Sequence, residues 1–159
     1  MIKHIAILLF MTVFVVSACG TNDGKQPVKS PTPKAISDQQ LAFALTALED
    51  NIRDADLTAL VEVVNKKAGA PVDYENLVEV QYYAKVLETF SGSATYDWVE
   101  YIDYEEADEI DSLEIDDEPF IISLYKNEHD VFHVPDVGYR MPNHPELIAK
   151  ARLLANLND

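Results

Sequence analysis

The chain has 159 residues, of which 28 are acidic and 12 basic, and its formal net charge is −16 at neutral pH. This excess of negative charge argues against a protein that binds nucleic acid or adheres directly to anionic lipid. The single cysteine, Cys19, leaves no pair for an intramolecular disulfide, so the fold has to be stabilised by a hydrophobic core.

The first 19 residues have the pattern of an export signal. Lys3 and His4 give a short positive start. An apolar run of about 12 residues follows over 5–16, shorter than the roughly 20 residues that span a bilayer. Small residues then precede the cysteine in Val16-Ser17-Ala18-Cys19. This stretch resembles a bacterial lipoprotein signal peptide with its lipobox. The alternative is an ordinary secretory signal in which the cysteine falls by chance.

The resemblance implies cleavage before Cys19 and attachment of lipid to its thiol, which is then unavailable as a nucleophile or metal ligand. It divides the chain into a signal peptide (1–18), a lipidated flexible tether (19–34) and one globular domain (35–159). The implied location is the cell envelope. In a Gram-negative cell this is the outer membrane facing the periplasm, because Gly20 rather than Asp follows the cysteine. In a Gram-positive cell it is the plasma membrane.

Three helices are expected in the first half of the domain, at about 38–53, 56–69 and 73–90. Ser37 and Gln40 form the pattern of a capping box at the start of the first helix. Gly69 and Pro71 are expected to end the second. The alternative is one long helix that continues through residues 54–56.

The second half predicts a small sheet and a closing helix. The expected strands lie at 95–104, 120–125 and 131–134, with a turn at 127–130. In the first strand, Tyr96, Trp98, Ile102 and Tyr104 are expected to face the core, with Glu100 as the one misfit on that face. Asn143 is expected to cap the last helix. The predicted fold class is α+β, with three N-terminal helices, a small antiparallel sheet of about three strands and a C-terminal helix.

An acidic segment, 97–118, is the clearest feature after the cysteine. It holds 12 acidic residues among 22 and has no Lys or Arg. Concentrated negative charge next to aromatic residues is typical of a surface that binds a basic protein. The partner-binding residues expected from this pattern are Tyr96, Trp98, Tyr101, Tyr104, Glu105, Glu106, Asp108, Glu109 and Asp111. The alternative is a solvated acidic loop that only keeps the domain soluble.

The basic residues near the C-terminus have a structural interpretation. Arg140 lies in a predicted loop over 139–144, and Lys150 and Arg152 lie on the last predicted helix. All three are expected to pair with the acidic segment rather than to bind a ligand.

No catalytic or metal-binding signature stands out. Ser123 and Lys126 match S-x-x-K, but on a predicted strand rather than at the start of a helix. No glycine lies between Gly92 and Gly138, so a calcium loop is not expected in the acidic segment. A hairpin with ordinary histidines is favoured over a metal site for one further group, Glu128, His129, His133, Asp136 and His144. We therefore expect no catalytic residue, no metal ligand and no cofactor.

These patterns lead to one functional hypothesis and two alternatives. The first is a membrane-anchored, non-enzymatic binding module for a basic protein partner, either as an immunity or inhibitor protein or in a pilotin-like accessory role. The first alternative is a carboxylate-dependent envelope glycan hydrolase. The second is a purely structural lipoprotein whose acidity serves only solvation.

Overall fold

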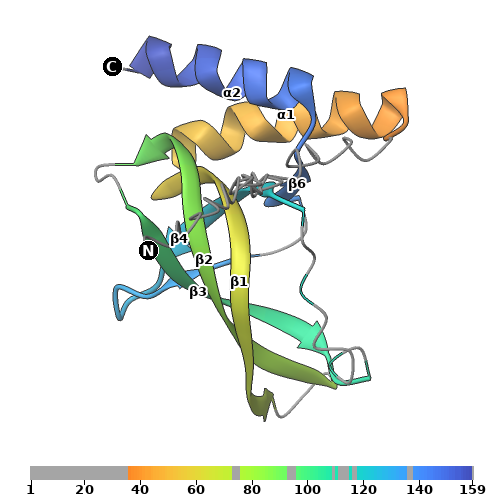
Figure 1. The fold of residues 1–159 in the computed structure, drawn as a ribbon, viewed down its shortest axis with the longest axis vertical. Coiled ribbons are helices and arrows are strands. Elements are labelled where there is room, and N and C mark those ends of the chain that lie inside the picture. Colours follow the sequence, from red (N-terminus) through yellow and green to blue (C-terminus); the bar gives the residue numbers. More distant parts are fainter. Residues whose placement is uncertain are drawn as a thin grey trace, which may run out of the picture. The chain divides into compact units, whose positions relative to one another are not determined.

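The structure is a computed structural model, and it describes residues 36–72, 76–92, 96–108, 110, 115, 118–135 and 138–158. Cys19, the predicted signal peptide and the predicted tether lie outside these residues. Residues Pro31–Asp159 form one compact unit. Its elements are α1 (Asp38–Asp54), β1 (Leu57–Val72), β2 (Leu77–Gly92), β3 (Trp98–Glu106), β4 (Phe120–Lys126), β5 (Phe132–His133), β6 (Arg140–Pro142) and α2 (Pro145–Asn158) (Figure 1).

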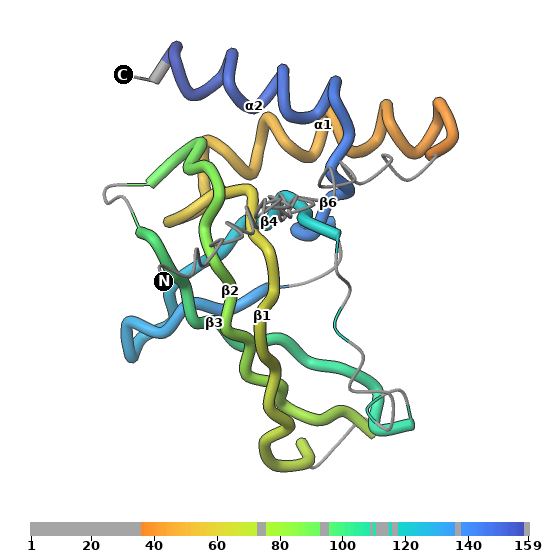
Figure 2. Tube along the Cα trace, in the orientation of Figure 1, coloured from red at the N-terminus to blue at the C-terminus, as the bar shows by residue number. Residues whose placement is uncertain are grey.

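Five of the strands form a sheet that closes on itself, in the order β1-β2-β3-β5-β4, because β1 pairs with both β2 and β4. The pairs are antiparallel except β3–β5, which is parallel through Tyr101–Phe132 and Ile102–His133. β6 adds to β4 as a sixth strand. Figure 2 shows β1 and β2 as a long hairpin that extends away from the helices. This architecture is that of an OB-type Greek-key fold, which hosts many functions and by itself implies none.

The predicted fold class is wrong: the described residues form two helices and a six-stranded mixed sheet, not three N-terminal helices, a three-stranded antiparallel sheet and a C-terminal helix. The residues expected to form the second and third helices form β1 and β2 instead. In β2, Val78, Val80, Tyr82 and Ala84 are buried and alternate with less buried residues, which is the two-residue period of a strand. Tertiary pairing decides between this period and the helical spacing that the same segment also fits.

The first helix is confirmed together with its capping box. The Gln40 backbone N–H donates to Ser37 Oγ at 3.3 Å, and the Ser37 backbone N–H donates to Gln40 Oε1 at 3.0 Å. The helix ends at Asp54, and Ala55 is extended, so a single long helix through residues 54–56 does not form. Local capping chemistry was therefore sufficient to place this element.

The C-terminal elements differ from the prediction in detail. The backbone N–H of Ile148 donates to the carbonyl of His144 at 3.0 Å, so His144 rather than Asn143 precedes the first helical residue of α2. The predicted loop over 139–144 contains the short strand β6. This strand brings Arg140 alongside β4, and that position matters for the pocket described below.

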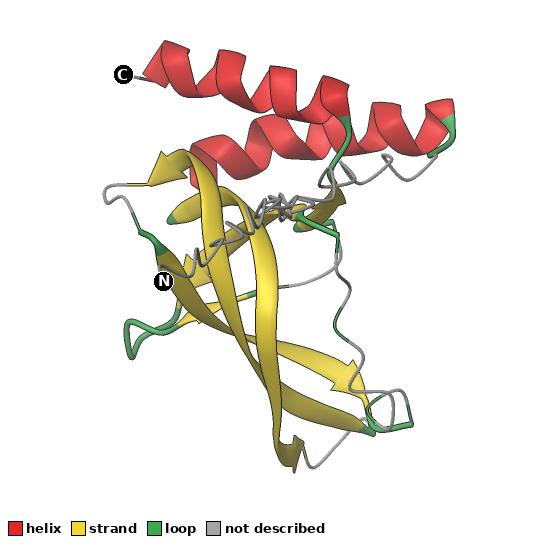
Figure 3. Cartoon of the chain, in the orientation of Figure 1, coloured by secondary structure: helices red, strands yellow, loops and turns green. Residues whose placement is uncertain are grey.

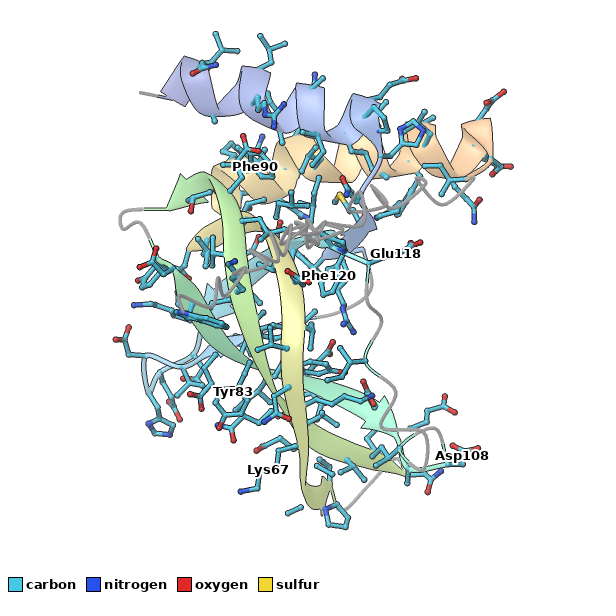
Figure 4. All side chains as sticks on the ribbon, in the orientation of Figure 1. Lys67, Tyr83, Phe90, Asp108, Glu118 and Phe120 are labelled. Carbon is cyan, nitrogen blue, oxygen red and sulfur yellow. The ribbon has the colours of Figure 1, made fainter. Side chains whose placement is uncertain are left out.

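Two hydrophobic cores lie on opposite faces of the sheet. Ile122 is fully buried among residues that fill the interior of the closed sheet. Its neighbour Ile121 is also fully buried, but among residues of α1 and α2 on the outer face. Both helices cover the same end of the sheet (Figure 3), and Phe90 lies beneath them (Figure 4). Successive residues of β4 thus hold together the closed sheet and its helical layer.

Among the residues that the structure describes, no helix is long and apolar enough to cross a membrane.

Candidate functional site

The strand β3 presents its faces the opposite way from the prediction. Val99 and Tyr101 are buried inside the closed sheet, whereas Trp98 is 58% and Tyr104 47% exposed. Glu100 lies on the exposed face with them, so it is not a misfit. The strand carries aromatic residues and carboxylates on both faces, so its two-residue period did not by itself show which face is buried.

Cross-strand pairing extends this exposed surface onto β2. Tyr83 lies opposite Glu100, Glu79 opposite Tyr104, and Lys85 opposite Trp98. We define the outer β2–β3 face as Glu79, Tyr83, Trp98, Glu100, Tyr104 and Glu106. It combines three aromatic rings with three carboxylates on the two strands.

The charges on this face are only partly balanced. Gln81 Nε2 donates to Glu100 Oε1, which leaves the negative charge of Glu100 in place. Lys85 lies on the same face, directly opposite Trp98, and Lys67 of β1 lies opposite Gln81. Tyr83 and Lys67 are labelled in Figure 4. The face therefore has a surplus of carboxylates and accessible rings, which suits a cationic partner.

The remaining residues predicted to bind a partner are distributed differently. Tyr96 packs edge-on against Phe132, with ring centroids 5.9 Å apart. Tyr101 has no exposed surface and stacks on Tyr82 at a centroid distance of 5.0 Å, so it does not contribute to an accessible face. Glu106 is exposed at the end of β3, on the outer β2–β3 face, and Asp108 is exposed just beyond that strand, where Figure 4 labels it. Glu109 and Asp111 lie outside the described residues, and Glu105 faces a pocket.

That pocket was not predicted. It has a volume of about 320 Å³ and is lined by Val63, Lys66, Tyr82, Glu105, Ile115, Phe120 and Arg140. The Arg140 guanidinium lies between two rings, with its carbon 4.7 Å from the centroid of Phe120 and 5.1 Å from that of Tyr82. Lys66 was assigned to a helix from the sequence, so its approach to Arg140 through closure of the sheet was not foreseeable from local patterns.

Two ion pairs link the pocket to the acidic segment. Lys66 Nζ lies 3.6 Å from Glu105 Oε2, and Glu105 Oε1 also accepts a hydrogen bond from the Tyr82 hydroxyl. Arg140 Nη1 lies 3.4 Å from Asp103 Oδ2. Burial raises the pKa of Asp103, while the backbone N–H of Tyr104 and the charge of Arg140 oppose that rise. Two of the acidic residues thus face inward rather than toward a partner.

The pairing expected for the C-terminal basic residues is confirmed for one of three. Arg140 contacts Asp103 of the acidic segment. Lys150 instead pairs with Glu49 of α1. Arg152 donates two hydrogen bonds of 2.7 Å each to Glu88 of β2, which lowers the pKa of that carboxyl. The last two pairs connect α2 to α1 and to β2, and they do not involve the acidic segment.

The structure does not support the S-x-x-K match or the histidine group as functional sites. Ser123 is fully buried, and its hydroxyl shares a 3.0 Å hydrogen bond with Thr58, so it is inaccessible to a substrate. Within the described ranges, no three His, Cys, Asp or Glu side chains gather into a possible metal site. His129 lies in an exposed turn 3.5 Å from Glu128, and Asp136 falls outside the described residues.

Comparison with known proteins adds no relative: no family model matches the chain, and no curated protein matches it.

Proposed function

We propose that this chain is a membrane-anchored envelope lipoprotein that acts as a non-enzymatic binding module for a basic protein. The outer β2–β3 face is the proposed contact surface. The observation that carries the proposal is the exposure of Trp98 and Tyr104 on one face of a strand, on either side of Glu100. Trp and Tyr are the side chains that most often dominate the binding energy of protein interfaces.

Charge defines the kind of partner. Glu79, Glu100 and Glu106 lie on the face, and the chain as a whole carries a net charge of −16. This field attracts a basic protein, accelerates its association and disfavours the phosphate backbone of nucleic acid. The β2–β3 face is also where OB-type folds commonly bind ligands, although this support is by analogy of fold alone. An immunity or inhibitor protein and a pilotin-like accessory lipoprotein both fit such a surface.

Replacing Trp98 with alanine is expected to weaken capture of the partner at least about tenfold, because the largest exposed aromatic side chain of the face is lost. The measurement is affinity capture from an envelope extract with immobilised residues 31–159, followed by titration of the recovered protein. Capture is also expected to fall with rising salt and with Glu100→Lys. Leu153→Ala is the matched control, because Leu153 is 56% exposed but lies on α2.

Two results would count against the proposed surface. One is undiminished capture by a Trp98→Ala, Tyr104→Ala double variant that keeps the far-ultraviolet circular dichroism of the wild type. The other is recovery of peptidoglycan fragments rather than a protein, since exposed aromatic rings also suit sugars.

Anchoring is tested separately. Cys19→Ser is expected to abolish incorporation of radiolabelled palmitate and to move the protein from the membrane fraction to the soluble fraction, because the thiol is the proposed site of acylation. Ser17→Thr, two residues away, serves as a control that keeps the thiol. A Cys19→Ser protein that is still labelled and membrane-bound would remove the basis for the anchor.

A carboxylate-dependent glycan hydrolase is the second candidate. One observation favours it: Asp103, a carboxyl whose pKa is raised by burial, lies beside a pocket that also contains Glu105. Against it, Glu105 is held by Lys66 and Tyr82, and Asp103 by Arg140. Release of soluble fragments from purified peptidoglycan, lost in Asp103→Asn, would favour this candidate over the binding module.

A further inference from the structure

The pocket beside β3 brings together two basic side chains of a chain that is mostly acidic. Only 12 of the 159 residues are basic, yet two of them, Lys66 and Arg140, line this pocket together with one carboxylate, Glu105. The side chain of Lys66 is only 9% exposed. Burying a charged side chain is costly unless it is paired, so the positive charges of this lining need negatively charged partners.

The two cations are loosely held by their carboxylates. The Lys66–Glu105 and Arg140–Asp103 distances are 3.6 and 3.4 Å. Two lysine or arginine pairs at the surface are tighter, with 2.7 Å for both Lys126–Asp130 and Arg152–Glu88. Good charge-assisted hydrogen bonds measure about 2.7–2.9 Å. The pocket cations therefore keep hydrogen-bonding capacity that the oxygens of a ligand can take.

The pocket is also shaped for a ligand that has a charged end and an apolar end. The rings of Tyr82 and Phe120 fix the Arg140 guanidinium between them. Val63, Ile115 and Phe120 supply an apolar wall. A volume of about 320 Å³ is at the lower end of the range for small-molecule sites. Fixed donors beside an apolar wall favour a small ligand of mixed character over an inorganic ion.

We propose that this pocket binds a small organic carboxylate. Its carboxylate group lies between Lys66 and Arg140, and its apolar part packs against Val63 and Phe120. The two cations are balanced by Glu105 in the lining and by Asp103 behind Arg140, so a ligand with a single carboxylate adds only one negative charge, whereas a multiply charged anion is repelled more strongly by these two carboxylates. This site is separate from the outer β2–β3 face, because neither Trp98 nor Tyr104 lines it.

Isothermal titration of the full-length protein in a non-ionic detergent tests the proposal, with benzoate as the probe. Benzamide is its neutral counterpart of the same shape, and inorganic phosphate tests anion binding without an apolar part. Benzoate is expected to bind at least about tenfold more tightly than either, because only benzoate uses both the cations and the apolar wall. Equal affinity for benzamide or for phosphate would overturn the proposal, as would no detectable binding of benzoate.

Variants locate the site. Arg140→Gln and Lys66→Met are each expected to weaken benzoate binding at least about tenfold, since each removes one cation. Lys66→Met keeps the length and packing of the side chain, so it remains informative if Arg140→Gln does not fold. Arg152→Gln, which removes a paired arginine on α2, is expected to leave binding unchanged. Wild-type affinity in a folded Lys66→Met variant would show that the ligand binds elsewhere. None of these outcomes bears on capture of a protein by the outer face.

Discussion

Alanine at position 121 is expected to destabilise the protein about as much as alanine at the neighbouring position 122, by about 2–5 kcal/mol in each case. Both isoleucines are fully buried, but they point to opposite faces of β4. Ile122→Ala leaves a cavity inside the closed sheet, and Ile121→Ala leaves one under α1 and α2. Urea unfolding of residues 31–159, followed by circular dichroism, measures both losses.

The control for this pair is Val64→Ala on β1. Val64 is 45% exposed, so its truncation is expected to change the free energy of unfolding by less than about 0.5 kcal/mol. If the helices did not cover the outer face of β4, one of the two adjacent isoleucines would be exposed to solvent, and its replacement by alanine would change the stability little. A near-zero effect at Ile121 would therefore contradict packing of the helices on the outer face of β4.

How far the sequence predicts this fold depends on whether an element is defined locally. The helix α1 is predictable because Ser37 and Gln40 satisfy the first turn by themselves. The strand β2 is not, because Leu77, Val80, Ala84 and Leu87 also fit a helical stripe. The choice is made by hydrogen bonds to β1 and β3, which are distant contacts that no short window of sequence contains.

The binding surface and the pocket also differ in how far local sequence patterns predict them. Residue types in the acidic segment indicated a binding surface, but their directions were inverted, since Trp98 faces outward and Tyr101 inward. The charge of that segment also overstated what a partner can reach, because Asp103 and Glu105 pair with Arg140 and Lys66. The pocket had no signal in the sequence, because Lys66 lies on β1 and Arg140 on β6, and these two strands come close only because both pair with β4.

Gly92→Ala is expected to lower the free energy of unfolding by about 2–4 kcal/mol, more than is usual for one added methyl group. Gly92 ends β2 with φ +124°, a backbone conformation that favours glycine. A Cβ there would lie 2.8 Å from the carbonyl oxygen of Asp56 and 3.3 Å from Leu57 Cδ1. Asp56 cannot easily retreat, because its carboxylate accepts a 2.8 Å hydrogen bond from the backbone N–H of Lys126.

Gly138→Ala separates the two causes of this loss. Gly138 also has a positive φ, +91°, but a Cβ there would meet nothing nearer than Phe43 Cε1 at 3.9 Å. Its replacement is expected to cost about 1–2 kcal/mol, from backbone conformation alone. The difference between the two variants in urea unfolding isolates the contact of Gly92 with Asp56, at the point where the chain passes from α1 into β1. Equal losses of stability would mean that the positive φ of the two glycines sets the loss and that the contact with Asp56 adds nothing. The junction between α1 and β1 would then have room for the added methyl group.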